Sequence, residues 1–298
     1  MSLFSTGGFV ADQDELRDVR ATDPGRVKRL LASRSRRPLL PADGRLMIVA
    51  CDHPARGALA AAGRADAMAN RRDVIDRLRT ALSRPGVDGV LGTADILEDL
   101  LLLGALEDKV VFSSMNRGGL AGSAFEMDDR MTGYDVRSTV ESGFEGAKML
   151  TRIDLDDTGS LATLEACAEA VSDLNRAELV AMVEPFMSRR VDGKVVNDLS
   201  VEAVVKSVAI TQGLGGSSAY TWMKLPVVEE MERVMEATNL PTLLLGGDPT
   251  GSSDEVYASW SKALAIAPVR GLVVGRSLLF PADDDVAGAV DTAVSLVH

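Results

Sequence analysis

One lysine lies inside an otherwise apolar segment of the chain. Lys224 stands in the run TWMKLPVV and has almost no polar neighbour in sequence. A lysine on a buried strand loses the hydration of its charged form, so its pKa is expected to fall. A neutral amine can attack a carbonyl carbon and form a Schiff base. The alternative is a structural lysine paired with a buried carboxylate, and its place in a strand leaves both interpretations open.

Three more charged residues stand in or at the end of apolar segments. Lys148 lies in GAKMLTRID, Glu184 in MVEPF, and Asp52 ends the run MIVACD. Two lysines in one interior would lower each other's pKa, and Glu184 would then supply the counter-charge and move protons. Asp52 is suited to hydrogen-bond a substrate hydroxyl or to assist proton transfer. A buried Lys148–Glu184 ion pair that only stabilises the fold is an equally open interpretation.

Two glycine turns near the C-terminus favour an anion site. The run LLLGGDPTG carries Gly246 and Gly247, and the run LVVGRSLLF carries Gly275, Arg276 and Ser277. Glycines let backbone N–H groups approach an anion, a following helix start adds a positive dipole, and an arginine fork fits phosphate oxygens. Either turn alone is a common feature. The two together predict a phosphate site.

Composition removes several classes of function. The chain has a formal net charge of −12, which disfavours non-specific nucleic-acid binding. Its only histidines are His53 and the C-terminal His298, so it offers no multi-histidine metal site, and we expect neither a metal nor an organic cofactor. Cys51 and Cys167 have no near partner in sequence and are expected to be core residues. His53 is expected to be a local structural group.

The segments that must position these residues alternate between two patterns. Short apolar runs are typical of strands buried on both faces, and longer segments between them have helical patterns. Helices are predicted at 160–176, 227–239 and 252–267. Strands are predicted at 46–52, 88–92, 109–114, 147–154, 179–185, 219–226, 241–247 and 271–276.

Eight such strand–helix units in about 250 residues predict an α/β fold, a (β/α)8 TIM barrel. We expect the barrel to occupy 46–298 and an N-terminal helical extension to occupy 1–45. The alternative is an open doubly wound sheet, but no strand is followed by the glycine pattern of a dinucleotide site. In a barrel, catalytic groups gather at the carboxyl ends of the strands. That edge would also hold Arg56, Ser114, Asn116, Arg117 and Arg152.

These motifs together resemble a known family from about residue 45 to 282. The chain is similar to class I aldolases of the DeoC/LacD type, which include tagatose-bisphosphate and sulfofructose-phosphate aldolases. The resemblance is carried by CDHPARGAL, AKMLTRID, VEPF, WMKLP, GGDPT and VGRSLLF. It is greatest to a subgroup linked with inositol catabolism. That subgroup implies cleavage of 6-phospho-5-dehydro-2-deoxy-gluconate to dihydroxyacetone phosphate and malonate semialdehyde.

The resemblance implies a role for each central residue. Lys224 would form the Schiff base, Lys148 and Glu184 would assist proton transfers, and Asp52 would contact substrate hydroxyls or the reacting carbonyl. The tyrosine acid that archaeal-type relatives carry on strand 5 is absent here, and Glu184 occupies the comparable segment.

The resemblance also implies that Gly247, Gly275 and Arg276 hold the phosphate. Relatives usually have a compact D-Q-R-G or D-H-G after strand 1. Here His-Pro-Ala separates Asp52 from Arg56, which puts the role of Arg56 in doubt.

Several alternatives stay open at this point. The substrate could be a sulfofructose phosphate or tagatose bisphosphate, with Arg56, Arg117 and Arg152 as extra cations. A sugar-phosphate isomerase or a non-catalytic sugar-phosphate-binding barrel would be a different class. The segment 128–135 could be a lid, a subunit contact or a plain loop. Barrels of this type often assemble, so we expect a homo-oligomer. The N-terminus lacks the pattern of a signal peptide and no apolar run reaches a membrane span, so we expect a cytoplasmic protein without a membrane partner.

Overall fold

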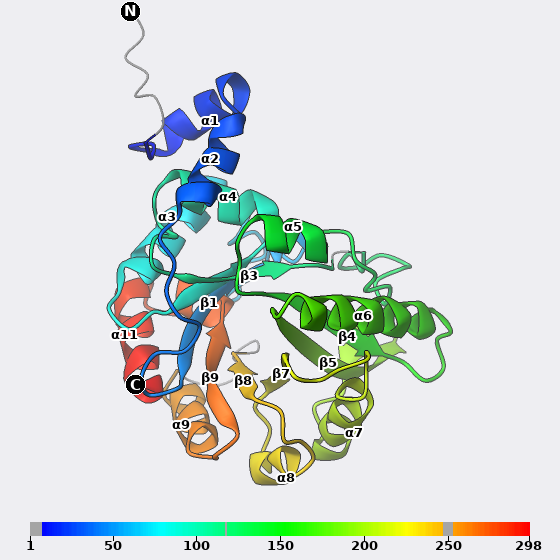
Figure 1. The fold of residues 1–298 in the computed structure, drawn as a ribbon. Coiled ribbons are helices and arrows are strands. Elements are labelled where there is room, and N and C mark those ends of the chain that lie inside the picture. The colour runs from blue at the N-terminus through cyan, green and yellow to red at the C-terminus, as the bar shows by residue number, and fades with distance from the viewer. Residues whose placement is uncertain (1–7, 117, 247–252) are drawn as a thin grey trace, which may run out of the picture.

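A computed structural model of the chain describes residues 8–116, 118–246 and 253–298. Eight parallel strands close on themselves, because each pairs with the next and the last pairs with the first (Figure 1). The predicted (β/α)8 barrel is therefore confirmed. Its strands are β1 (Leu46–Cys51), β2 (Gly89–Gly92), β3 (Val110–Ser114), β4 (Gly146–Ile153), β5 (Val180–Val191), β7 (Thr221–Pro226), β8 (Thr242–Leu245) and β9 (Val269–Val274).

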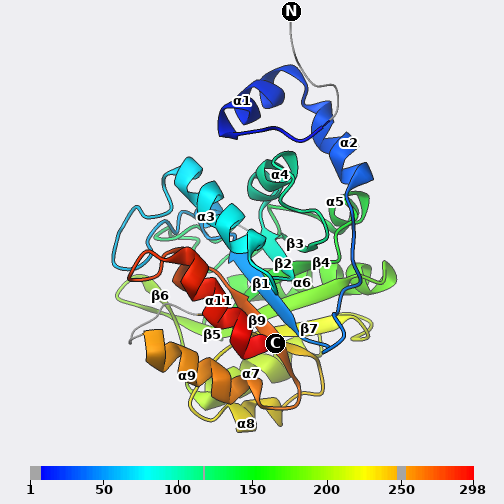
Figure 2. The same ribbon diagram turned by 90° about the vertical axis from the view of Figure 1, so that its left-hand side faces the viewer.

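Helices surround the barrel and cover its outer face (Figures 1 and 2). Among the described residues, none of them is long and apolar enough to cross a membrane. They are α3 (Arg71–Ser83), α4 (Ala94–Leu102), α5 (Val136–Glu141), α6 (Gly159–Arg176), α7 (Val201–Thr211), α8 (Met231–Met235), α9 (Ser253–Leu264), α10 (Arg276–Leu279) and α11 (Val286–Val297), with a short 3-10 turn, η1 (Pro54–Arg56), after β1.

The strands send alternate side chains to two separate cores. Met47, Val49 and Cys51 of β1 belong to the large core between barrel and helices, whereas Leu46 and Ile48 belong to a smaller core inside the barrel. This follows from the two-residue period of a strand, and it explains why the segments are apolar throughout. The same period decides which charged residues face the barrel axis.

Two helices precede the barrel and lie beyond α3 and α4, at the molecule's end that carries the N-terminus (Figures 1 and 2). They are α1 (Gln13–Thr22) and α2 (Gly25–Ser33). Asp12 caps α1 by accepting hydrogen bonds from two backbone N–H groups of its first turn. Arg20 ties α1 to α4 through Asp99 at 2.6 Å. The division of the chain at residue 45 into two units stays a prediction.

The structure differs from the predicted elements in two places. The fifth strand continues past 185 to Val191 and turns back as β6 (Lys194–Asn197), which makes an antiparallel hairpin. Asp192 and Gly193 both have positive φ, as a tight two-residue hairpin turn requires. The helix predicted at 227–239 was too long, since only Met231–Met235 is helical. The residues that follow Pro226 instead form a loop, and Val227 lines the barrel mouth.

Candidate active site

The predicted charged residues meet at the carboxyl ends of the strands because they share the inward register. Lys224 is two residues beyond the interior core residue Trp222, and Glu184 is two residues beyond Met182. Asp52 continues the inward row of β1, two residues after Ala50. Each side chain therefore leaves its strand on the axis side.

Two lysines share one carboxylate at the centre of the barrel mouth. Lys224 Nζ donates to Glu184 Oε1 at 2.7 Å, and Lys148 Nζ lies 2.5 Å from Glu184 Oε2. Lys148 also donates to Asp52 Oδ2 at 3.2 Å. The result is a continuous chain of alternating charges, which we call the lysine cluster: Asp52, Lys148, Glu184 and Lys224.

Burial and neighbouring charge change the proton affinity of this cluster. Lys224 is 4% exposed, and burial lowers its pKa; the Lys148 ammonium lowers it further, against the attraction of Glu184. Burial alone would raise the pKa of Glu184, but the two ammonium groups outweigh it and lower that pKa to about 2. Glu184 is therefore ionised at neutral pH, and Lys224 becomes a neutral amine more readily than an exposed lysine would.

Ser114 and His53 complete the first end of the cluster. Ser114 Oγ donates to Asp52 Oδ2 at 2.9 Å, so this oxygen accepts hydrogen bonds from both the serine and Lys148. His53 Nδ1 lies 3.7 Å from Asp52 Oδ1. Burial lowers the pKa of His53 to about 3, which keeps the imidazole neutral. The sequence marked Ser114 only as a strand-end residue, and it gave His53 only a local structural role.

A cavity of about 640 Å³ opens above the lysine cluster. On the β8 and β9 side it is lined by Gly246, Gly275 and Arg276, and η1 contributes Arg56. Gly275 has no room for a side chain, because a Cβ there would lie 2.4 Å from the carbonyl oxygen of Ala50. The glycine lets β9 end against β1 and leaves backbone at the cavity wall. Gly246, Gly275 and Arg276, which the sequence predicted to bind phosphate, thus line the same cavity as Arg56.

The other residues predicted for phosphate fall elsewhere. Ser277 lines a neighbouring cavity beside Trp260 and Phe280 rather than the one above the lysine cluster. Gly247 lies outside the described residues, as does Arg117. Arg276 also donates to the carbonyl oxygen of Ala60 at 3.5 Å, which links it to the segment after β1.

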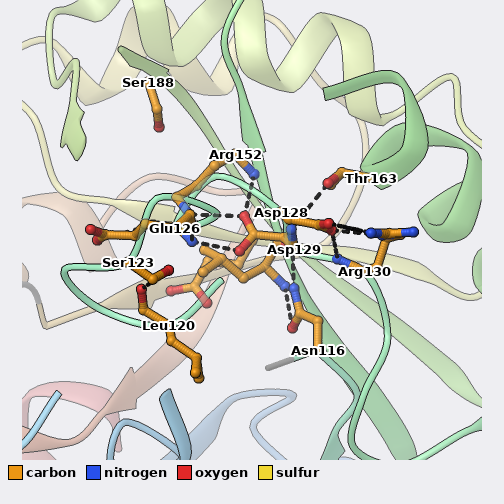
Figure 3. Close-up of polar contacts among 12 residues, drawn as sticks. Asn116, Leu120, Ser123, Glu126, Asp128, Asp129, Arg130, Arg152, Thr163 and Ser188 are labelled. Carbon is orange, nitrogen blue, oxygen red and sulfur yellow. Dashed lines mark hydrogen bonds and ion pairs between the residues drawn. The ribbon is translucent and has the colours of Figure 1, made fainter. Parts of the chain in front are cut away.

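A second buried charge cluster lies at the end of β4 (Figure 3). Arg152 is 3% exposed and grips Asp129 with two donors, Nε at 2.8 Å and Nη2 at 2.6 Å. Its Nη2 also donates to the backbone oxygen of Glu126, and the Glu126 carboxylate lies 3.7 Å from Nη1. The backbone N–H of Asp129 donates to Thr163 Oγ1 on α6. We call Arg152, Asp129 and Glu126 the arginine cluster.

The arginine cluster anchors part of the predicted loop 128–135. Asp129 is buried within it, and Asn116 forms a β-bridge with Met131. The loop is therefore anchored at Asp129 and Met131, while Arg130, Thr132 and Gly133 are exposed; a role as a lid or a subunit contact stays a prediction. Arg152, which the sequence offered as a spare cation for a second anion, is already paired with a buried carboxylate.

Two expectations concern groups away from the lysine cluster. Cys51 and Cys167 are both buried, as expected of core residues. Within the described ranges no group of three or more His, Cys, Asp or Glu side chains could hold a metal ion. Metal independence itself stays a prediction.

Comparisons with known proteins agree with this architecture. Residues 44–294 match a family described as Cgl0159-like. The crystal structure of Cgl0159 from Corynebacterium glutamicum is 60% identical to the chain, covers 96% of each chain and superimposes with a TM-score of 0.94. No curated protein matches the chain.

More distant solved structures share the barrel fold. A Schiff-base-forming fructose-1,6-bisphosphate aldolase is 20% identical over 91% of this chain and 100% of its own, with a TM-score of 0.63. An archaeal fructose-1,6-bisphosphate aldolase, whose catalytic lysine is bound to a carbinolamine intermediate, is 18% identical over 91% and 99%, with a TM-score of 0.64. At these identities the likeness shows the fold alone.

Proposed function

The chain belongs to the Cgl0159-like family, and we propose that it is a class I aldolase that forms a Schiff base on Lys224. The observation that carries the proposal is a buried lysine of lowered pKa that shares Glu184 with a second lysine beneath a cavity. Lys148 divides its contacts between Asp52 and Glu184, whereas Lys224 contacts only Glu184 within this cluster. The burial of Lys224 and the nearby Lys148 ammonium then favour its neutral amine, which can attack a carbonyl carbon.

The proposed substrate is a phosphorylated keto-sugar or keto-sugar acid. Its phosphate lies against Gly246, Gly275 and Arg276, with Arg56 beside them, and its ketone lies over Lys224. The products are dihydroxyacetone phosphate and an aldehyde. Within this class, 6-phospho-5-dehydro-2-deoxy-gluconate, which would give malonate semialdehyde, is the substrate that the family resemblance in the sequence favours.

The reaction begins at the amine. Neutral Lys224 attacks the ketone carbon, and the carbinolamine loses water to give an iminium ion. The ionised Glu184, 2.7 Å from the lysine nitrogen, takes the proton that the amine releases and returns it to the departing hydroxyl. Lys148 holds the other oxygen of Glu184, so the carboxylate stays directed at Lys224.

Bond cleavage follows from the iminium ion, which accepts an electron pair. With carbons numbered as in a ketose whose ketone is C2, a carboxylate of the lysine cluster removes the proton of the C4 hydroxyl, the C3–C4 bond breaks, and the aldehyde leaves. Asp52 is the group at the opposite end of the cluster from Lys224, with Oδ2 held by Ser114 and Lys148. The remaining enamine is protonated at C3, and water hydrolyses the new iminium to release dihydroxyacetone phosphate and free Lys224.

Trapping the covalent intermediate tests the proposal. The enzyme is treated with borohydride in the presence of dihydroxyacetone phosphate, and its intact mass is measured for the wild type, Lys224→Met and Lys148→Met. We expect one reduced adduct in the wild type, none in Lys224→Met, and a slower adduct in Lys148→Met. Wild-type protein without an adduct would remove the aldolase proposal and favour an isomerase that uses no imine. An adduct that persists in Lys224→Met would place the Schiff base on another lysine.

A further inference from the structure

Strand β4 extends farther toward the barrel mouth than its neighbour β3. It pairs with β5 over all of Gly146–Ile153, but with β3 only as far as Ser114, which lies opposite Lys148. Among the described residues, no strand pairs with the β3-facing edge of β4 beyond that point. Alternate residues of a parallel strand direct their backbone groups to the same neighbour, so this edge belongs to Leu150 and Arg152, the next residues in register with Lys148.

Side chains complete this edge of β4. Asn116 Oδ1 accepts from the backbone N–H of Leu150 at 3.0 Å, and the Asn116 amide nitrogen donates to the backbone oxygen of the same residue. One amide thus makes both hydrogen bonds that a neighbouring strand would make. Farther along, Asp129 Oδ2 accepts from the backbone N–H of Arg152 at 3.1 Å, at the same edge of the mouth (Figure 3). Asn116 and Leu150 are both buried, so water does not readily replace the two bonds between them.

The position of these bonds connects them with the lysine cluster. Leu150 is two residues beyond Lys148 on β4, and both line the cavity. Just before the asparagine, the backbone N–H of Met115 donates to the backbone oxygen of Lys148 at 3.0 Å. Two consecutive residues therefore fix the backbone of β4 at Lys148 and at Leu150. Lys148 Nζ lies 3.2 Å from Asp52 Oδ2 and 2.5 Å from Glu184 Oε2, so a shift of β4 would change both distances.

We propose that Asn116 is a positioning residue of the active site: its amide holds β4 on the β3 side and thereby keeps the Lys148 ammonium between its two carboxylates. This inference rests on the proposed aldolase function, and no step of that mechanism uses Asn116. The effect on the chemistry passes through Lys148, which directs Glu184 at Lys224. The Lys148 charge also lowers the pKa of Lys224. A loosened β4 would weaken both effects.

The test measures how fast the borohydride-reducible adduct with dihydroxyacetone phosphate forms across a range of pH, in the wild type and in Asn116→Ala. A Lys148 ammonium that is held less closely lowers the pKa of Lys224 less, so in the variant the rate should begin to rise at a pH about 0.5 to 1 higher. At a fixed pH below that range, adduct formation should slow by about three- to tenfold, because fewer Lys224 amines are neutral. An unchanged pH profile would overturn the proposal, whatever happens to stability.

A second buried asparagine provides a matched control. Asn175 Oδ1 accepts from the backbone N–H of Tyr220 at 2.9 Å, and its amide nitrogen donates to the backbone oxygen of Val171 at 2.9 Å. Tyr220 directly precedes β7, so these bonds lie at the strand's amino end, four residues before Lys224. Asn175→Ala should lower stability in urea unfolding about as much as Asn116→Ala does, yet leave the pH profile of adduct formation unchanged. If both variants move the profile alike, a general loosening of the barrel is the cause and the proposal fails.

A double-mutant cycle tests whether Asn116 acts through Lys148. Asn116→Ala should slow adduct formation in the wild-type background, but by less than about twofold in the Lys148→Met background, where the ammonium is already gone. Equal slowing in both backgrounds would contradict the proposal. If Asn116→Ala does not fold, Asn116→Ser, which keeps a hydroxyl beside the Leu150 backbone, replaces it in every comparison with the same expected directions.

The outcomes separate this inference from the proposed function. If the wild type forms the adduct on Lys224 and the Asn116 variant keeps the wild-type pH profile, the aldolase stands and the inference falls. If the wild type forms no adduct, both fall.

Discussion

Two clusters of buried opposite charges border the same cavity, and their chemistry differs. In the lysine cluster, Lys224 and Lys148 share Glu184. In the arginine cluster, Arg152 grips Asp129 through a two-point fork. A guanidinium keeps its proton in proteins, whereas a buried ammonium can lose it. Burial of charge is therefore no mark of function by itself; what matters is whether a group can change its protonation state next to open space.

The largest expected effect is the loss of the nucleophile from the lysine cluster. Lys224→Met replaces a buried ammonium by an apolar side chain of similar length, so we expect the fold to persist and kcat to fall by about 10⁴-fold or more. Steady-state kinetics and thermal unfolding measure the two effects separately. A variant that retains kcat within tenfold of the wild type would contradict the reactive role of this cluster.

Substitutions in the arginine cluster should lower the stability of the fold rather than the catalytic rate. Asp129→Asn removes the carboxylate that accepts from two donors of the buried Arg152 and leaves it only the Glu126 carboxylate at 3.7 Å, so the free energy of unfolding should fall by about 3–5 kcal/mol. Asp128→Asn removes an exposed pair with Arg130 from the same loop and should cost under about 1 kcal/mol.

Urea unfolding curves measure both values, and borohydride trapping on the folded Asp129→Asn protein should still give the adduct on Lys224. If Asp129→Asn abolished the adduct without lowering stability, the two clusters would not differ as described.

Within the lysine cluster, Glu184 should affect both rate and proton affinity. Glu184→Gln removes the carboxylate that moves protons, so kcat should fall by about 10²–10³-fold. Because the Glu184 charge raises the pKa of Lys224, the variant should lower it further. The rate of adduct formation should then begin to rise at lower pH than in the wild type. Borohydride trapping at a series of pH values measures this rate. If the rate began to rise at higher pH instead, the charge of Glu184 would not be what raises the pKa of Lys224.

Much of this arrangement could be predicted from the sequence, because the alternation of side chains along a strand decides which residues face the barrel axis. Lys148, Glu184 and Lys224 interrupt apolar runs, and the two-residue period sends them inward once a barrel is assumed. The pairing itself could not be predicted. Nothing in the sequence says that Glu184 lies between the two lysines rather than beside one, because that depends on the closure of β4, β5 and β7.

The arginine cluster and the hairpin were harder to predict for different reasons. Asp129 lies in a loop rich in charges, where the sequence does not distinguish a buried carboxylate from its less buried neighbours Asp128 and Arg130. The hairpin did carry a signal, since Asp192-Gly193 between valine-rich segments is typical of a two-residue turn. The helix predicted over 227–239 was too long at both ends: the glutamates after Pro226 signalled a helix start, yet α8 spans only Met231–Met235.

The smallest expected effect concerns His53, which lies beside the lysine cluster without belonging to it. Burial lowers the pKa of His53 to about 3, so it should stay neutral across the working pH range. The amine must be neutral to attack; kcat/KM should therefore rise with pH through the pKa of Lys224, below the range of an exposed lysine.

His53→Asn should keep the position of that limb and change kcat/KM by no more than about threefold, less than a full neutral hydrogen bond would contribute, because His53 Nδ1 has no hydrogen-bond partner among the described residues. A pH–rate profile of both proteins measures it. If the limb were lost with the imidazole, His53 would be the titrating base and would have to be counted within the reactive cluster.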